Sequence, residues 1–510
     1  MFKKSIYISL LSFFVSVLSF CNQLLVAYFF GAKEKIDLFF SITSFPLLLG
    51  GVLSISVSYF LIPYIKKQQL IFNELDFKKY LYFFLRDVTT KLTIVVIVFS
   101  VIVICYQKFI LLIPFTTTNL ILSILALLTS FFLVIISILT AFNNVEEKYF
   151  LAVLISFLPP IFSIIVIIFL NNTLSTLSIQ IGFLTGAIIG TFILIKDYCF
   201  SIFSKNENKF KDSIKLFYKQ MPFVVIAILS FTIYQPIDAY WGSKLGTSNV
   251  AYLGYLQRLI IAISVIVISG PTIILMPRLT EYFVKEKRSE FLNLSVKAIN
   301  WVFILSVFFA LVCSLLSSQI IQLLFQRAAF TEVDTFNMSQ VFPIMLVGMC
   351  FMVLFTILFR IIFINGNTKK ASLIGIFSTV IYFISSGFFS HFLGLKGICL
   401  AYAFTWGIVF FIAAYSIFKQ FKNYFFKLEQ ITLICKIILL SVFVTLFFQR
   451  FINYKVNDFT FSFQLINLTW KCLIITVLFF SVGIYLFKIN ELMEIMKSLK
   501  SIIYNSNKKK

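Results

Sequence analysis

The stretch "YFFGAKEKIDLFF", residues 28–40, decides the fold because it separates two long apolar runs by one short polar turn. The first run follows Lys3 and Lys4 and continues to Phe30, and the second continues to residue 65. Each run exceeds the roughly 20 residues that an apolar helix needs to cross a bilayer. The first run has no small-residue cleavage site, so we interpret it as a retained membrane span rather than a signal peptide.

The same alternation continues along the whole chain of 510 residues, of which 60% are hydrophobic and 12% charged. A soluble fold cannot bury so much apolar surface. We therefore predict an all-α polytopic membrane protein with about fourteen transmembrane helices. The predicted spans lie near residues 5–30, 36–65, 80–105, 118–142, 149–170, 174–195, 214–241, 249–277, 293–325, 336–364, 371–392, 396–418, 429–449 and 464–487.

The basic residues alternate in phase with these spans. One set of loops, together with both termini, carries 28 Lys and Arg, whereas the opposite set carries eight. Because Lys and Arg gather in cytoplasmic loops, this pattern predicts that the N-terminus and the C-terminus are both cytoplasmic. The net charge of +23 is thereby explained by topology, and we expect no nucleic-acid partner.

The most basic loop, residues 196–219, lies between spans six and seven and divides the first twelve spans into two sets of six. A weak repeat surrounds it, since Gly31 precedes Pro63 by about the same distance as Gly246 precedes Pro277. Parallel repeats of this kind occur in transporters whose halves rock about a central cavity. We predict a six-helix lobe over 1–200, a cytoplasmic linker over 201–213, a second lobe over 214–420, and two extra helices with a basic tail over 421–510.

Enzyme chemistry finds no support in the motifs. The only histidine is His391, the eight cysteines are scattered singly, and the chain has no HExxH, GxxxxGK[ST] or GxSxG pattern. We therefore assign no catalytic residue, no metal site and no cofactor.

Ionisable residues inside spans are costly and so point to function. Asp37 begins span two, Asp238 ends span seven, Arg258 lies about ten residues into span eight, and Arg360 lies near the inner end of span ten. Snorkelling to the interface is an alternative for Arg360, and capping of its own helix is an alternative for Asp37. Arg258 is too deep for easy escape, so we expect it to face a cavity, where a guanidinium suits phosphate oxygens.

Two further patterns concern helix geometry. Three glycines at four-residue spacing in "GFLTGAIIG", residues 182–190, predict a flat strip for close helix contact. The pair Pro159–Pro160 in span five is expected to bend or loosen its helix.

Several motifs, in order along the first 420 or so residues, resemble the MurJ/MviN family of lipid II flippases, within the multidrug/oligosaccharidyl-lipid/polysaccharide exporter superfamily. They are "FFGAKEKIDLFFSITSFPLLLGG", "AFNNVEEKYFLAVLISFLPP", "IDAYWGSKLGTSNVAYLGYLQRL", "LLFQRAAFTEVDT" and "LFRIIFINGNTKKASLIG". The resemblance implies two six-helix lobes in a V around a cationic central cleft, with the last two helices forming a groove for a polyprenyl tail.

The resemblance also assigns roles to single residues. It implies that Asp37 acts in gating, that Arg258 and Arg360 bind substrate, and that Asp238 serves cation or proton coupling. Where the family has cleft arginines on spans one and two, this chain has Ser16, Asn22 and Gly51, and we expect Ser16 and Asn22 to take part in substrate binding. Span eleven offers a sodium site only Tyr382, Ser385 and Ser386.

These observations predict a divergent flippase of the bacterial inner membrane that moves an undecaprenyl-pyrophosphate-linked saccharide from the inner to the outer leaflet by alternating access. The saccharide is lipid II or a related glycan. A coupling cation or the membrane potential is expected to drive transport, and cell-wall glycan polymerases are candidate partners. Two alternatives stay open: a flippase for O-antigen, capsule or exopolysaccharide repeat units, and a non-transporting membrane scaffold for glycan polymerisation.

Overall fold

The computed structural model describes residues 2–146, 148–196, 198, 208–364, 368–420, 428–452 and 461–493, and within them every regular element is a helix. Thirteen helical segments of this part are long and apolar enough to cross a membrane. The additional helix α1 has a shorter described apolar part, Phe14–Phe30. All fourteen predicted spans coincide with helices, so the all-α polytopic fold is confirmed.

The helices follow one another with short connections. In chain order they are α1 (Phe2–Phe30), α2 (Glu34–Ile71), α3 (Glu74–Cys105), the π-helical turn η1 (Tyr106–Ile110), α4 (Thr117–Val145), α5 (Tyr149–Ile155), α6 (Leu158–Leu174), α7 (Leu177–Ile195), α8 (Asn208–Thr232), α9 (Tyr234–Ser243), α10 (Asn249–Val284), α11 (Arg288–Leu315), α12 (Ser317–Phe325), α13 (Glu332–Ile364), α14 (Thr368–Leu393), α15 (Leu395–Gln420), α16 (Leu428–Phe451) and α17 (Phe461–Tyr485).

Three predicted spans are each a pair of helices rather than one continuous helix. The predicted span 149–170 divides into α5 and α6, because Pro159 and Pro160 lie in the first turn of α6 and lack the amide hydrogens that would continue α5. The predicted span 214–241 divides at Ile233 into α8 and α9, and the predicted span 293–325 divides at Leu316 into α11 and α12. The break at Ile233 has a similar cause, since Pro236 lies in the first turn of α9 and lacks the amide hydrogen that would bond the Thr232 carbonyl. The sequence offers no proline at the break at Leu316.

The chain forms two compact units. Unit 1 comprises Met1–Ala262, Arg327–Thr331 and Thr368–Ile398, and unit 2 comprises Ile263–Gln326, Glu332–Asn367 and Cys399–Lys510. The predicted division into lobes at 201–213 and at 421 stays a prediction. Residues 201–207 of its linker, 421–427 and the basic tail from 494 onward lie outside the described residues.

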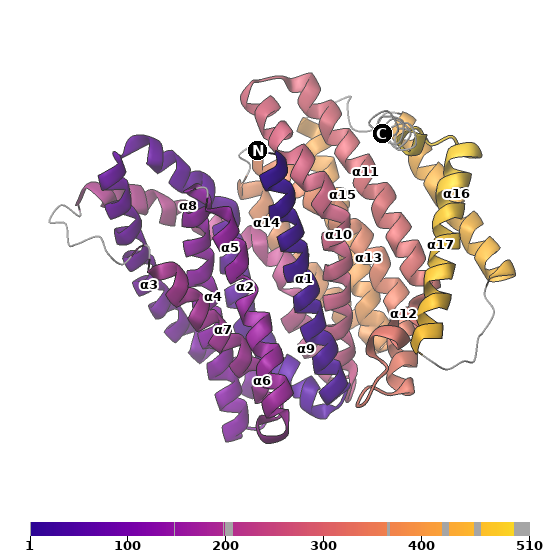
Figure 1. Ribbon diagram of the computed structural model, residues 1–510, viewed down its shortest axis with the longest axis horizontal. Coiled ribbons are helices and arrows are strands. Elements are labelled where there is room, and N and C mark those ends of the chain that lie inside the picture. Colours follow the sequence, from indigo (N-terminus) through magenta and orange to yellow (C-terminus); the bar gives the residue numbers. More distant parts are fainter. Residues whose placement is uncertain are drawn as a thin grey trace, which may run out of the picture. The chain divides into compact units, whose positions relative to one another are not determined.

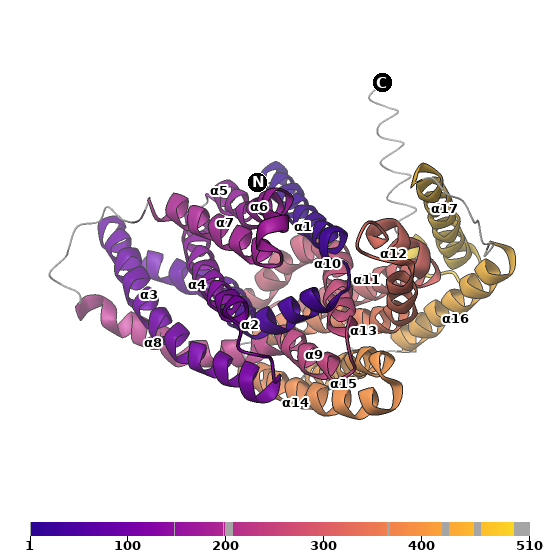
Figure 2. The same cartoon turned by 90° about the horizontal axis from the view of Figure 1, so that it is seen from below.

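In unit 1, α2 is the central packing element. It lies along α4 and also contacts α3, α8 and α9 (Figures 1 and 2). A core of aromatic and aliphatic side chains joins α2, α3, α4, α7 and α8; Tyr80, Phe84 and Phe142 are fully buried in it. This core fixes the faces that α2 turns toward α9 and α10.

The three glycines of α7 permit a very close approach to α6. A Cβ atom at Gly182 would collide with the backbone of Ser163, and one at Gly186 would collide with the backbone of Leu158 and Pro159. Small residues let membrane helices gain van der Waals contact that larger side chains would prevent. The predicted close helix contact is confirmed.

Pro46 lies inside α2. Because proline has no amide hydrogen, the Ile42 carbonyl one turn earlier lacks its usual helical donor. The side-chain amide of Gln107, from η1, donates to this carbonyl over 3.1 Å, and its own oxygen accepts from the Ser123 hydroxyl. From α4, the Ser130 hydroxyl donates to the Pro46 carbonyl over 2.8 Å. The π-helical turn therefore supplies the polar group that a proline inside a membrane helix requires.

Unit 2 contains a separate core in which α11, α12, α16 and α17 pack together. Beside this core lies an apolar cavity of about 650 Å³, lined by residues of α11, α13, α15 and α16. The helix α17 packs against α16, as both views show, and contributes no residue to the described lining (Figures 1 and 2). Of the last two helices, α16 alone contributes to the described lining of this cavity, and the predicted groove for a polyprenyl tail stays a prediction.

Candidate functional site

A small polar cavity in unit 1 brings together two of the ionisable residues that the sequence singled out. It has a volume of about 30 Å³, and both Asp238 and Arg258 line it. Its walls come from one face of α2, from α9 and from α10; the remaining lining residues are Phe40, Thr43, Ser44, Leu47, Gln235, Ala239, Val250, Leu253, Gly254 and Gln257. A space of this size holds about one water molecule.

The short helix α9 is held on both sides, and this positions Asp238. The Tyr106 hydroxyl of η1 donates to the Pro236 carbonyl over 3.0 Å. The indole nitrogen of Trp241 donates to the Phe383 carbonyl of α14 over 3.1 Å, where Gly387 leaves room for the indole ring. The helix α9 is thus fixed between η1 and α14.

The Asp238 carboxylate is buried and its hydrogen bonds come from neutral donors. The Tyr382 hydroxyl donates to one carboxylate oxygen, and the side-chain amide of Gln257 donates to the other. No ion pair involves Asp238 in the described part of the chain. A buried charge without an ionic partner is costly, so an ionised Asp238 would require a further positive group in this cavity.

Arg258 is the next residue after Gln257, and its side chain is half-buried. It lies nine residues after the start of α10, or about 14 Å along the helix, which is about half of the hydrocarbon thickness. Its guanidinium makes no hydrogen bond and no ion pair within the described residues. It is therefore an available cationic group in a membrane-embedded cavity.

Asp37 lies in the first turn of α2 and binds the beginning of another helix. Its carboxylate accepts hydrogen bonds from the backbone amides of Ser248 and Ala251, the second over 2.7 Å. These amides belong to the N-terminal end of α10, where the helix dipole favours a negative charge. Asp37 therefore caps α10 rather than its own helix, and no basic side chain of the described residues pairs with it.

The turn between α1 and α2 makes further contacts with distant segments of unit 1. Gly31 has a φ of 63°, which favours glycine. Its carbonyl accepts from the Tyr255 hydroxyl over 2.7 Å, and its missing Cβ leaves room for the backbone of Ala329. The amide of Ala329 donates to the Tyr28 carbonyl over 3.1 Å. The motif "LLFQRAAFTEVDT" thus reaches the α1–α2 turn through its central residues.

The other predicted substrate-binding residues lie elsewhere. Asn22 is fully buried, accepts from the Ser163 hydroxyl of α6 over 3.2 Å, and lines none of the described cavities. Ser16 is half-buried on α1. Arg360 is half-buried near the end of α13 and belongs to unit 2. Unit 1 thus gathers Arg258 and Asp238 at one cavity, and neither Ser16 nor Asn22 lines it.

Sequence reasoning missed Gln257 as a partner of Asp238 and the backbone amides as partners of Asp37. Gln257 carries a local signal, because it adjoins Arg258 on α10. A second local signal lies on α2, where the polar residues Thr43 and Ser44 share one helix face with Phe40. Backbone partners leave no mark in the side-chain pattern.

Comparison with known proteins gives a consistent result. The sequence profile of the family described as "Lipid II flippase MurJ" matches residues 26–469. A "Probable lipid II flippase MurJ" of Helicobacter pylori strain J99 is 29% identical over 218 residues, which cover 41% of this chain and 46% of that protein. The alignment thus spans less than half of this curated relative. A protein of the same description from a second Helicobacter pylori strain is 29% identical over 217 residues.

Among solved structures, "Lipid II flippase MurJ, inward closed conformation" matches with a TM-score of 0.75 and 20% sequence identity, covering 94% of this chain and 100% of that one. An inward-facing multidrug resistance transporter of the MATE family in the MOP superfamily matches with a TM-score of 0.64 and 13% identity, covering 80% of this chain and 95% of that one. At these identities the likeness concerns the fold. The match of the family profile over most of the chain decides membership: this protein is a multi-pass membrane protein that belongs to the lipid II flippase MurJ family.

Proposed function

We propose that this chain translocates an undecaprenyl-pyrophosphate-linked saccharide, lipid II or a closely related glycan, from the inner to the outer leaflet of the bacterial inner membrane by alternating access. The observation that carries the proposal is the Arg258 guanidinium, which lines a polar cavity nine residues into α10 and makes no ion pair within the described part of the chain. A guanidinium stays charged at any accessible pH and binds phosphate oxygens through a planar fork. No bond of the substrate is made or broken.

The apolar cavity of unit 2 supports a lipid-linked substrate. Its volume of about 650 Å³ and its apolar walls suit a segment of polyprenyl chain. The polar cavity of unit 1 holds only about one water molecule in this structure. The pyrophosphate would therefore contact Arg258 in a state of the transport cycle in which this cavity is wider, and Arg360 would serve as a further basic contact.

Asp238 is the proposed coupling residue. Its two hydrogen-bond donors, Gln257 and Tyr382, are neutral. A negative charge on this carboxylate is therefore balanced by no ion pair within the described residues, and a bound cation or proton would neutralise it. Transport would then depend on a cation gradient, whereas transport driven by the membrane potential alone would not require Asp238.

Asp37 is the proposed gating residue. Its bonds to Ser248 and Ala251 join the predicted first lobe to the beginning of α10, which belongs to the predicted second lobe. Alternating access requires these two bonds to break when the outer side opens.

By the distribution of basic residues, both termini face the cytoplasm, where glycan polymerases or their partners could also be recruited.

The test is complementation after depletion of the native protein, with the accumulating lipid-linked intermediate identified on the cytoplasmic face. We expect Arg258→Ala to fail, Arg258→Lys to retain part of the activity because it keeps the charge but loses the fork, and Arg450→Ala, at an exposed position near the end of α16, to complement fully. Full activity of Arg258→Ala at normal membrane levels would remove this residue from the mechanism.

A second candidate is transport of O-antigen, capsule or exopolysaccharide repeat units. It is favoured by Ser16 and Asn22, which stand where the family carries cleft arginines. Accumulation of a repeat-unit intermediate, with a normal level of lipid II, would select this candidate.

A further inference from the structure

A group of five exposed lysines lies at one end of unit 1 and has no counterpart in the proposed transport mechanism. They are Lys66 and Lys67 near the end of α2, and Lys211, Lys215 and Lys219 along the first half of α8. We call this group the α2–α8 lysine cluster. None of the five makes a hydrogen bond or an ion pair within the described residues.

The cluster is held together by the packing of α8 on α2. The Tyr64 hydroxyl donates to the Ser213 carbonyl. The ring of Phe217 lies 5.5 Å from that of Tyr64 and 5.6 Å from that of Phe60, measured between centroids. Phe210, Ile214 and Phe217 are buried, which leaves the lysines on the opposite face of α8. The arrangement is therefore amphipathic and fixed.

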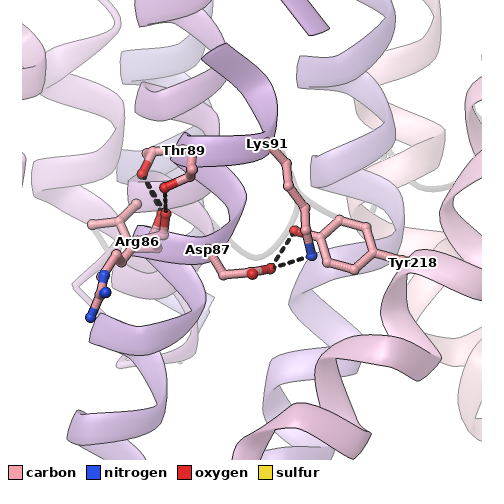
Figure 3. Close-up of polar contacts among 7 residues, drawn as sticks. Arg86, Asp87, Thr89, Lys91 and Tyr218 are labelled. Carbon is pink, nitrogen blue, oxygen red and sulfur yellow. Dashed lines mark hydrogen bonds and ion pairs between the residues drawn. The ribbon is translucent and has the colours of Figure 1, made fainter. Parts of the chain in front are cut away.

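The acid on α3 that contacts α8, Asp87, does not neutralise the cluster, because its partners are Tyr218 and Lys91. Asp87 accepts from the Tyr218 hydroxyl and from the Lys91 ammonium, each over 2.8 Å (Figure 3). The Lys91 ammonium also lies 3.8 Å from the centre of the Tyr218 ring. These contacts join α3 to α8. Within them the Asp87 carboxylate and the Lys91 ammonium balance each other, so Asp87 leaves the charge of the five lysines unchanged. On α8 between Asn208 and Lys219, Asp212 is the only acidic residue, so the cluster keeps a net positive charge.

Apolar side chains are exposed close to the lysines along the chain. Ile71 and Leu75, in and beside the α2–α3 turn, are 62% and 76% exposed, and Leu216 on α8 is 47% exposed. The apolar part of α8 begins at Met221, two residues after Lys219. Basic residues interleaved with exposed apolar ones beside the start of a membrane span are typical of a surface that contacts lipid headgroups and the upper acyl chains. An acidic soluble partner would leave these apolar side chains uncovered.

We propose that the α2–α8 lysine cluster binds the phosphate groups of anionic phospholipids in the leaflet on its side of the membrane. Lysine suits this role, since a flexible ammonium contacts headgroups without the fixed geometry of a guanidinium. The proposal depends on the membrane location of the chain and not on its transport activity.

The test titrates the full-length protein, purified in a neutral detergent, with short-chain phosphatidylglycerol and counts the bound lipids by native mass spectrometry. The variant is the triple substitution Lys211→Gln, Lys215→Gln and Lys219→Gln. The matched control is Lys33→Gln, Lys35→Gln and Lys396→Gln, which removes the same charge from three exposed lysines of unit 1 at the beginnings of α2 and α15. Phosphatidylcholine serves as the neutral lipid and polyglutamate as the acidic peptide.

We expect the α8 triple variant to bind phosphatidylglycerol about ten- to a hundredfold more weakly than the unmodified protein. The control is expected to bind normally, and a triple replacement by arginine is expected to retain binding. Added salt should weaken binding by the unmodified protein. Lys66→Gln with Lys67→Gln provides an independent variant if the triple substitution impairs folding.

Three results would overturn the proposal. The α8 triple variant could bind as tightly as the unmodified protein, the control could lose affinity equally, or polyglutamate could bind more tightly than phosphatidylglycerol. The first would show that the cluster is not the site, the second that only net charge matters, and the third that the surface takes an acidic protein.

Discussion

Replacement of Asp37 by Asn tests the proposed outer gate most directly. The carboxylate accepts from the backbone amides of Ser248 and Ala251. An asparagine side chain has one acceptor oxygen, so it can keep one of these hydrogen bonds, and its own amide group faces the other N–H. The substitution also removes the negative charge that favours the N-terminal end of α10.

The magnitude follows from these two contacts. A hydrogen bond to a charged group contributes about 1.5–3 kcal/mol, which corresponds to about a ten- to hundredfold change in an equilibrium constant. Ser248 adds to the effect, because its φ of 73° is unfavourable for a residue other than glycine and the Asp37 bond helps to hold it. We therefore expect Asp37→Asn to raise the population with an open outer side by about ten- to hundredfold.

The assay measures the accessibility of a cysteine placed at Ser44, which is buried and lines the polar cavity. A version without the native cysteines is labelled in intact cells with a membrane-impermeant maleimide, and the labelling rate reports how often the outer side opens. Glu34→Gln is the matched control, since it removes an exposed negative charge from the same helical turn. A labelling rate for Asp37→Asn within about twofold of the Glu34→Gln rate would refute the gate. The related variant Asp37→Ala should abolish transport at a normal membrane level.

The remaining predictions concern contacts inside unit 1. Gly186→Leu should separate α6 from α7 and lower the unfolding temperature in detergent by several degrees, because the side chain meets backbone atoms of Leu158 and Pro159, whereas Gly407→Ala, with no atom nearer than 3.8 Å, should have little effect. Gln107→Leu should cost about 1–3 kcal/mol by leaving the Ile42 carbonyl without its donor, and an unfolding temperature equal to that of the unmodified protein would contradict this role. Tyr382→Phe removes one donor to buried Asp238 and should alter the cation or proton dependence of transport, whereas Tyr415→Phe, at an exposed position, should not.

The helices themselves could be predicted because their signal is local. An apolar run of sufficient length in a chain with few charges has one stable state in a bilayer, since every backbone polar group must be satisfied within the segment. The glycine spacing of α7 and the prolines of α6 are equally local, and both predictions are confirmed. The break at Ile233 was not predicted, although Pro236 in the first turn of α9 is a local signal for it. Tertiary contacts of α9 then hold the short helix in place.

The candidate site was predictable only in part. Arg258 and Asp238 could be selected because an ionisable residue in a membrane span needs a reason to be there. Asp238 and Arg258 lie 20 residues apart on consecutive helices. The α2 wall of their cavity and the contact of Asp238 with Tyr382 on α14 each join segments more than a hundred residues apart. For Asn22 the sequence-based prediction of substrate binding finds no support in this geometry. Its side chain accepts a hydrogen bond from Ser163 and lines none of the described cavities.

The sequence by itself determined that this chain is a multi-pass helical membrane protein of a recognisable family, because hydrophobic length and motif order are properties of the chain alone. Only the tertiary structure decided which polar groups meet. The cap that Asp37 provides for α10, the amide of Gln107 beside Pro46 and the position of Arg258 at the polar cavity all depend on which helix faces which. The physical reason is that a buried polar group is satisfied by whatever donor or acceptor packing brings within about 3 Å, and that distance is set by the fold rather than by spacing along the sequence.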